Sequence, residues 1–264
     1  MQLKLLIKIP KIQMAAVLVL IFFSAFLYQP LFSKLTSFLL AVGSTVLADL
    51  IFLKLRSIKP FFPKAGLVTG LIIGLLVAPN LPLYEIVAVG VIAMAAKHLL
   101  RIDKRHIFNP AGLGSFLVGT VFSHEISWWG VSWQQLSLTN FKLLSGFLLL
   151  LVPGLISVIR LRRWGTIGAF WSVYLLGTWV IQVGSGQNFH LNLDPTTLFF
   201  SLVMLPEPVT TPIHYSPQIW FGFFVGIISL LVSLPQFSAF LPVILADSLV
   251  LALLLGNLVF FKYK

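Results

Sequence analysis

The sequence predicts an all-α integral membrane protein, folded as a single polytopic membrane domain over residues 1–264. Of these residues, 58% are hydrophobic and only 9% are charged, and the mean hydropathy is +1.01. Long apolar runs with so few charges are typical of transmembrane helices rather than of a soluble domain. The chain contains no cysteine, which excludes disulfides, cysteine-held metal ions and thiolate-bound iron–sulfur clusters.

Hydropathy and helix breakers divide the chain into about ten expected transmembrane segments. Their expected bounds are 13–32, 35–53, 65–79, 83–100, 110–123, 142–159, 165–183, 195–205, 218–234 and 239–261. The first is expected to be retained as a helix, because no small-x-small cleavage site follows it. The fifth and eighth start at Asn109-Pro110 and Asp194-Pro195, where a capping side chain precedes a proline at the first helical position.

The third and eighth segments are shortened, and each ends in a proline-rich run. The third covers 14 residues from Ala65 to Ala78, or about 21 Å of helix, whereas the hydrocarbon core is about 30 Å thick. The two runs read APNLP from Ala78 and LPEPVTTP from Leu205. Matched broken segments point to a pathway between inverted repeats. We therefore expect two inverted five-helix repeats, at about 12–124 and 141–261.

Basic residues gather on one side of the predicted membrane. Counted over alternating loops, 16 of the 18 lysines and arginines fall on one side, and only Lys34 and Lys142 fall on the other. The positive-inside rule then places both termini in the cytoplasm and the protein in the cytoplasmic membrane. The lipid bilayer thus accounts for the net charge of +11, and no nucleic-acid partner is expected. The same count indicates that the third segment crosses rather than returns.

A basic cluster precedes the fifth segment. Lys104, Arg105 and His106 lie just before Asn109, at a helix N-terminus whose partial positive charge adds to theirs. This arrangement suits a phosphate or another anion, such as the anionic part of a cofactor. The alternative is an ordinary cytoplasmic loop that contacts lipid headgroups.

Polar residues of the broken segments are further candidates. Irregular backbone at membrane depth is tolerated only where it is buried in protein or lines a wet cavity. Thr210 and Thr211 could offer hydroxyls, and Glu207 a carboxylate, to the occupant of such a cavity. Alternatively, Glu207 lies in solvent at the cytoplasmic end. Thr69, in the third segment, is a candidate for an ion pathway, although a small residue there also suits plain helix packing.

Two aspartates lie within apolar segments, and an acid within a span is a candidate for a cation or proton pathway. Asp247 is about eight residues into the last expected span, whereas Asp49 is five residues before Lys54 and could simply reach the interface. No catalytic pattern, phosphate loop or metal-ligand spacing is present, so no catalytic residue and no metal ligand is predicted.

Four blocks of the sequence occur in a recognisable order. They are LVTGLIIGLLVAP from Leu67, KHLL from Lys97 with RHIFNPAGLG from Arg105, LPEPVTTP from Leu205, and DSLVLALLLGN from Asp247. These blocks resemble the RnfD/NqrB family of membrane subunits, found in the Rnf complex and in the sodium-pumping NADH:quinone reductase. The resemblance implies a ten-helix fold related to ammonium and urea channels. It also implies a subunit that helps to pass electrons between flavins, coupled to sodium or proton movement.

One departure from that family concerns the cofactor. Its best-known members attach FMN covalently to a threonine in a Ser-Gly-Ala-Thr motif, and no such motif occurs here. Covalent FMN is therefore not expected, and a flavin (FMN or riboflavin) would be bound non-covalently. The resemblance further implies separate redox subunits that carry flavin or iron–sulfur centres.

The leading hypothesis is a membrane subunit of an Rnf/Nqr-like ion-coupled electron-transport system, contributing to transmembrane electron or cation transfer. Such a chain is at most a flavin-carrying or non-catalytic subunit of an oxidoreductase complex. The alternative is a channel or secondary carrier for a small solute or ion that uses the same fold without flavin. A third hypothesis is a structural subunit with no pathway of its own.

Overall fold

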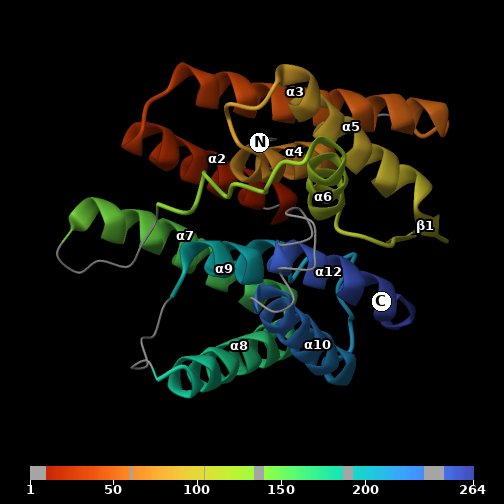
Figure 1. The fold of residues 1–264 in the computed structure, drawn as a ribbon. Coiled ribbons are helices and arrows are strands. Elements are labelled where there is room, and N and C mark those ends of the chain that lie inside the picture. The colour runs from red at the N-terminus through yellow and green to blue at the C-terminus, as the bar shows by residue number, and fades with distance from the viewer. Residues whose placement is uncertain (1–9, 60–61, 104, 134–139, 187–192, 235–246) are drawn as a thin grey trace.

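The computed structural model describes residues 10–59, 62–103, 105–133, 140–186, 193–234 and 247–264. Within these ranges the chain is built almost entirely of helices, as Figure 1 shows. The helices are α2 (Pro10–Tyr28), α3 (Phe32–Leu55), α4 (Lys64–Leu76), α5 (Leu83–Leu99), α6 (Pro110–Phe122), α7 (Phe141–Leu161), α8 (Trp164–Gly184), α9 (Pro195–Phe199), α10 (Tyr215–Ser233) and α12 (Ser248–Val259). The π-helix η1 (Phe200–Met204) continues α9, and the short 3-10 helix η3 (Phe261–Tyr263) follows α12. The prediction of an all-α, multi-pass membrane protein is confirmed.

Most of the described helices fall into two length classes, and α5, with 17 residues, lies between them. By length and composition, α2, α3, α7, α8 and α10 are long and apolar enough to cross a membrane. The expected short third and eighth segments correspond to α4, with 13 residues, and to α9 with η1, with five residues each. Helices α6 and α12 are equally short, with 13 and 12 residues. For α12 this differs from the expected span 239–261, of which 239–246 lie outside the described residues.

Each short segment is followed by irregular backbone. In each half, a side chain from the second helix or its start holds this backbone in place. After α4, the carbonyl oxygen of Pro79 accepts a hydrogen bond of 2.7 Å from the hydroxyl of Ser37. After η1, the guanidinium of Arg163, at the start of α8, donates to the carbonyls of Pro208, at 3.3 Å, and Pro212. Arg163 itself is buried. These contacts satisfy backbone groups that lipid could not, which is the condition for irregular backbone at membrane depth.

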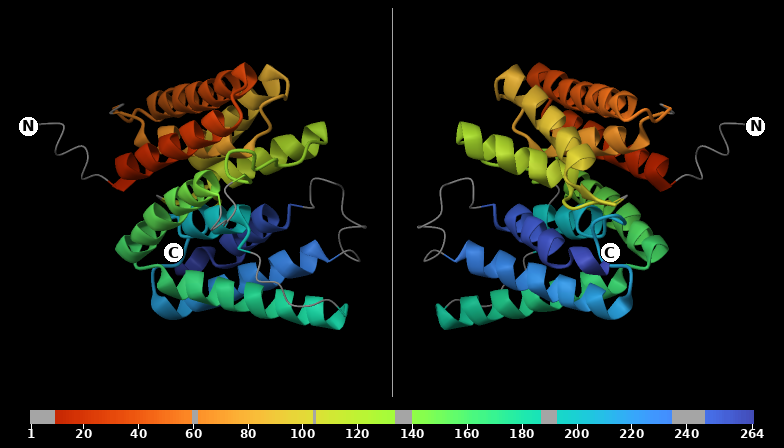
Figure 2. Two further views of the ribbon diagram at one scale, coloured as in Figure 1. Left: turned by 90° about the vertical axis from the view of Figure 1, so that its left-hand side faces the viewer. Right: turned by 90° about the vertical axis from the view of Figure 1, so that its right-hand side faces the viewer.

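Helices α2 to α6 and helices α7 to α12 form two groups, the upper and lower parts of Figure 1 and of both views in Figure 2. In the first group α3 packs against α4 and α5, and α5 packs against α6. In the second, α10 packs against α8 and α12. The groups meet where α2 contacts α7 and where α6 contacts α12. Large side chains fill the interior, including the fully buried Phe22, Ile73, Phe170, Phe200 and Phe221.

A small hairpin connects α5 to α6. Its strands β1 (Arg101–Ile102) and β2 (Arg105–His106) are antiparallel, with Arg101 opposite His106. Asp103 takes a left-handed conformation (φ 55°) in the turn, which aspartate tolerates better than most residues. The backbone N–H of Ile107 then bonds to the carbonyl of Leu100 at 3.0 Å. The hairpin was not predicted, and it fixes where His106 stands ahead of α6.

Candidate functional site

A cavity of about 420 Å³ lies between the two groups of helices. Its wall comes from the first halves of α2 and α4, the start of α6, the second half of α7 and the chain after η1. Four of the predicted site residues line it, namely Thr69, His106, Asn109 and Glu207. The rest of the wall is largely apolar, with the basic side chains of Lys11, Lys97 and Arg160 added. The cavity thus combines an apolar wall with groups that attract an anion.

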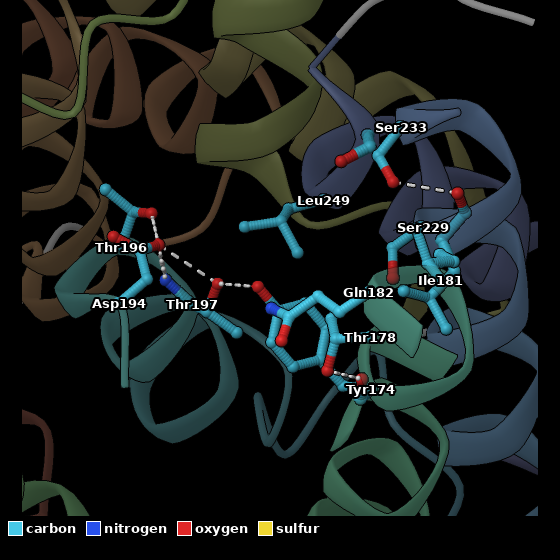
Figure 3. Close-up of a pocket in the computed structure, with 12 residues that line it drawn as sticks. Tyr174, Thr178, Ile181, Gln182, Asp194, Thr196, Thr197, Ser229, Ser233 and Leu249 are labelled. Atoms are coloured by element: carbon cyan, nitrogen blue, oxygen red, sulfur yellow. Dashed lines mark hydrogen bonds between the residues drawn. The ribbon is translucent and has the colours of Figure 1, made fainter. Parts of the chain in front are cut away.

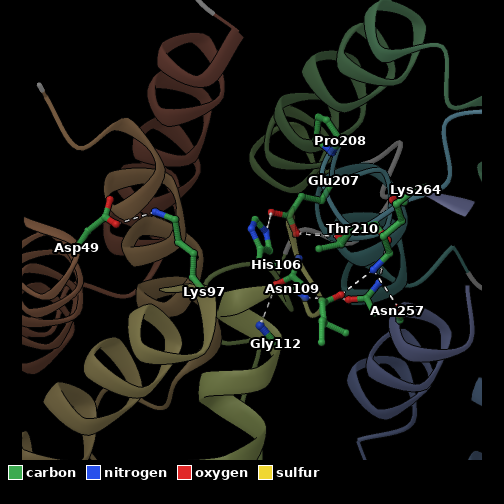
Figure 4. A network of polar contacts seen from close by, with 12 residues as sticks. Asp49, Lys97, His106, Asn109, Gly112, Glu207, Pro208, Thr210, Asn257 and Lys264 are labelled. Atoms are coloured by element: carbon green, nitrogen blue, oxygen red, sulfur yellow. Dashed lines mark hydrogen bonds and ion pairs between the residues drawn. The ribbon is translucent and has the colours of Figure 1, made fainter. Parts of the chain in front are cut away.

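The start of α6 is fixed by the predicted cap. The side-chain oxygen of Asn109 accepts from the backbone N–H of Gly112 at 2.9 Å, and Pro110 occupies the first turn. The backbone N–H of Asn109 in turn donates to the side-chain oxygen of Asn257, on α12, at 2.8 Å. The amide of Asn257 donates to the carbonyl of Thr210 at 3.3 Å. A buried asparagine therefore joins the RHIFNP and LPEPVTTP blocks of opposite halves beside the cavity (Figure 4).

Glu207 is the centre of the polar contacts beside this cap. Its Oε1 lies 3.4 Å from Nε2 of His106, a residue 101 positions earlier in the chain. Its Oε2 accepts from the hydroxyl of Thr210 at 3.0 Å. The hydroxyl of Thr211 is used differently, because it donates to the carbonyl of Leu205 at 2.6 Å and closes the loop after η1. Glu207 and His106 form a pair of titratable groups at the cavity wall.

Lys264 is a third titratable group in this network. Its ammonium donates to the carbonyls of Ile107, at 2.6 Å, and Asn257, at 2.9 Å. Burial lowers the pKa of Lys264 to about 8, although the nearby Glu207 carboxylate acts in the opposite direction. Since its protonated form is the charged one, this lysine loses its positive charge as the pH rises through about 8. The polar cluster around Glu207 therefore becomes more negative in that range.

One predicted member of the anion site, Arg105, does not line the cavity, and another cannot be placed. Arg105 is exposed in β2, and its side chain is not part of the cavity lining. Lys104 lies outside the described residues. The basic groups that do line the cavity include Lys97 and Arg160, which come from the ends of α5 and α7. The basic side chains that the structure shows at the cavity therefore come from several helices rather than from one continuous stretch of the sequence.

Asp49 lies in a separate, buried polar cluster between α3, α4 and α5. Its Oδ2 accepts from the backbone N–H of Gly66 at 3.0 Å, in the first turn of α4. Its Oδ1 accepts from Lys97 Nζ and His98 Nε2, both at 2.7 Å. Asp49 is only 1% exposed. The carboxylate therefore ties three helices together, and it is set apart from the Glu207 cluster in Figure 4.

The contacts of His98 define its tautomer. Nη1 of Arg56 lies 3.2 Å from Nδ1 of His98, and a guanidinium can only donate. Nδ1 must therefore accept, and the ring proton sits on Nε2, where it donates to Asp49. Lys97, the other partner of Asp49, also lines the cavity. Lys97 is thus the link between the buried Asp49 cluster and the candidate site.

Asp247 stands at the start of helix α12. Helix α12 begins at Ser248, and one carboxylate oxygen of Asp247 accepts from the backbone N–H of Val250 at 2.9 Å. The other oxygen accepts from the indole N–H of Trp128 at 2.7 Å. Asp247 therefore precedes α12 instead of lying within it, whereas its expected depth of about eight residues in the last span stays a prediction, because 239–246 lie outside the described residues. Asp247 caps the N-terminal end of α12, whereas Asn257 lies near the C-terminal end of the same helix.

Several residues of the two polar clusters were missed from the sequence. Asn257 is fully buried in an apolar helix, and a polar residue within a span is a signal that could have found it. In the sequence Lys97 and His98 belong to a basic stretch, and nothing marks them as partners of a buried carboxylate. Arg163 gave no local signal, because its partners are the carbonyls of prolines some 45 to 49 residues later in the chain.

These features define a class of protein: a multi-pass helical membrane protein with two broken segments and a largely apolar cavity, edged by charged side chains, where its two halves meet. A family model describing the NQR2, RnfD and RnfE family matches residues 6–142, which is about half of the chain. The chain belongs to this family, as the sequence blocks predicted. The match ends before the block at Leu205, whose likeness rests on the sequence alone. No curated protein matches the chain.

Proposed function

We propose that this chain is a membrane subunit of an Rnf/Nqr-like system for ion-coupled electron transport, located in the cytoplasmic membrane. One observation carries the proposal. The RHIFNP block, inside the matched residues, meets the LPEPVTTP block at a cavity, through the contact between His106 and Glu207. A pathway built from the two broken halves would pass between these blocks.

The cavity suits a flavin held without a covalent bond. Its volume of about 420 Å³ falls within the range of roughly 300–1,000 Å³ typical of cofactor sites. Its apolar wall would take the ring system, and Lys97, Arg160 and His106 would hold anionic or polar groups. When bound, a flavin supplies one- and two-electron redox chemistry. The protein residues orient it, exclude water and, at His106 and Glu207, hold a proton.

The absorption spectrum of the purified protein tests this cofactor. Purified in mild detergent, the chain is expected to carry a flavin that acid precipitation releases into the supernatant. Arg160→Gln should lower flavin occupancy several-fold, because a charged cavity residue is lost. Arg162→Gln is the matched control, since Arg162 is exposed and does not line the cavity. Colour retained in the acid pellet would contradict non-covalent binding, and a colourless protein would contradict the flavin itself.

We further propose that the ten helical segments cross the membrane as two inverted repeats. The same helix contacts recur in the two halves. In the first half α2 contacts α4, α3 contacts α5, and α5 contacts α6. In the second half the corresponding contacts are those of α7 with α9 and η1, of α8 with α10, and of α10 with α12. The break after each short segment is held from the second helix of its half, by Ser37 or Arg163. Five segments per half, an odd number, invert the second half.

Cysteine labelling tests this topology, and the chain has no native cysteine to interfere. Ser57, after α3, and Ser185, after α8, are both exposed, and five expected crossings separate them. In intact cells a membrane-impermeant maleimide should label Ser185→Cys but not Ser57→Cys. After permeabilisation both should react. Labelling of both in intact cells would mean that one of the five segments between them does not cross.

A second candidate function is a channel or carrier for a small solute or ion. It is favoured by the missing Ser-Gly-Ala-Thr motif together with a cavity at each end of the broken α9–η1 segment. Solute uptake by the protein alone in liposomes would support it. Copurification of flavin-carrying or iron–sulfur subunits would support the electron-transport proposal instead.

A further inference from the structure

A second cavity, of about 380 Å³, lies in the second half of the chain (Figure 3). It is lined by the C-terminal ends of α8 and α10 and by the N-terminal ends of α9 and α12. The first cavity is lined instead by the chain at the other end of η1. The broken α9–η1 segment therefore runs from one cavity to the other. In the proposed topology this second cavity faces the outside.

The charge of the second cavity differs from that of the first. Asp194 is the one charged side chain among its described lining residues. The hydrogen bonds that the structure gives this carboxylate all go to Oδ2, from the backbone N–H of Thr197 at 3.0 Å and from the hydroxyls of Thr196 and Thr197. Within the described part of the chain no hydrogen bond reaches Oδ1, so this oxygen can accept one from an occupant of the cavity. The described wall thus carries a negative charge that no lining cation neutralises.

The hydroxyl groups of this cavity act mainly as acceptors. The hydroxyl of Thr178 donates to the carbonyl of Tyr174 at 2.8 Å. The hydroxyl of Ser229 donates to Gly226 at 2.9 Å, and that of Ser233 to Leu230 at 2.8 Å. A hydroxyl has a single proton to donate, so these three present only lone pairs to the cavity. These three oxygens can accept hydrogen bonds from the N–H groups of a ligand, and the polar side chains of Tyr174, Gln182 and Ser248 also line the cavity.

The size of the cavity favours an organic molecule over a bare ion. A volume of about 380 Å³ far exceeds the roughly 30 Å³ that one water occupies in the liquid. The part of the chain that the structure describes holds no group of three histidine, aspartate or glutamate side chains that could bind a metal. Aliphatic side chains of Ile181, Leu230 and Leu249 complete the wall and would contact carbon atoms of the ligand. We propose that this cavity binds a small organic cation with a primary ammonium group.

Binding of three probes of matched size tests the proposal on the full chain in detergent, by isothermal titration calorimetry. Ethanolamine carries the ammonium group, ethylene glycol is its neutral counterpart and glycolate its anionic one. Ethanolamine is expected to bind at least about tenfold more tightly than ethylene glycol, because only the cation meets the Asp194 charge. Glycolate should show no binding at this cavity.

Asp194→Asn is the decisive variant. Asparagine still accepts the N–H of Thr197 and preserves the helix cap, but it removes the charge. Ethanolamine should then lose about tenfold or more in affinity, and its advantage over ethylene glycol should disappear. Glu125→Gln, which changes an exposed carboxylate outside the cavity, should leave binding unchanged.

A second variant guards against failure of Asp194→Asn to fold. Thr178→Val keeps the shape of the side chain and removes one acceptor oxygen, so ethanolamine should bind several-fold more weakly. Equal affinity for the three probes, or unchanged ethanolamine binding in the folded variants, overturns the proposal. None of these readouts depends on a flavin or on redox subunits, so the result is separate from that for the electron-transport function.

Discussion

Replacing Asp49 with alanine is expected to destabilise the protein more than any other single change at its polar residues. The substitution leaves the ammonium of Lys97 and the ring N–H of His98 without their buried acceptor, and it uncaps the N–H of Gly66. Removing one partner of a buried ion pair costs about 3–5 kcal/mol. Because these contacts join α3, α4 and α5, the first half should lose its packing.

The measurement is thermal unfolding and size-exclusion chromatography in detergent, compared across three variants. Asp49→Asn keeps an acceptor for Gly66 and should fall between the parent and Asp49→Ala. Adding Lys97→Met to Asp49→Ala should recover part of the loss, since it removes the uncompensated charge. A stable Asp49→Ala protein that has lost ion coupling would instead support the predicted pathway role of this aspartate.

The helices were predictable from the sequence because their signals are local. Apolar runs, proline breaks and caps placed most segment bounds within a few residues of the observed ones. Asn109 illustrates the reason, since its capping bond to Gly112 spans only three residues. Asp247 shows a local signal that was overlooked. An aspartate directly before an apolar run is itself a helix-start pattern, and the structure uses it that way.

The site was only partly predictable, because its contacts join distant parts of the chain. The sequence selected His106 and Asn109 at a basic helix start, and Glu207 and Thr210 in a proline-broken segment. The structure places these two pairs side by side. The sequence does not show that Asn257 links Asn109 to Thr210. Likewise, hydropathy cannot show that the partners of Asp49 lie 48 and 49 residues later. Such pairings depend on which helices become neighbours, which single-segment patterns do not encode.

The proposed repeat relation between the two halves rests on how their helices pack as well as on the lengths of their helices. Gly90 is the eighth residue of α5, and Gly222 is the eighth residue of α10. Each lies where its helix closely approaches the second helix of its half. A Cβ on Gly90 would meet Ser44 and Thr45 of α3, and one on Gly222 would collide with the carbonyl oxygen of Thr166 on α8. Glycine at both positions lets the helix backbones approach.

Gly222→Ala is therefore expected to be strongly destabilising despite the small size of the added methyl group. Its Cβ would meet the backbone oxygen of Thr166 and lie 2.9 Å from Cβ of Ala169, so α8 and α10 must separate. Overpacking of this kind costs about 1–3 kcal/mol or more. The measurement is the midpoint of thermal unfolding in detergent. Gly168→Ala, on α8 with open space around it, is the matched control and should not lower the midpoint.

Gly90→Ala extends the comparison to the other half. If the halves are inverted copies of one packing unit, this change should lower the unfolding midpoint by an amount similar to that of Gly222→Ala. A large effect in one half and none in the other would show that the shared helix order does not reflect shared packing. A tolerated Gly222→Ala would mean that α8 and α10 lie farther apart than in this structure. Because α10 also packs against α12, that result would weaken the placement of Asn257 at the candidate site.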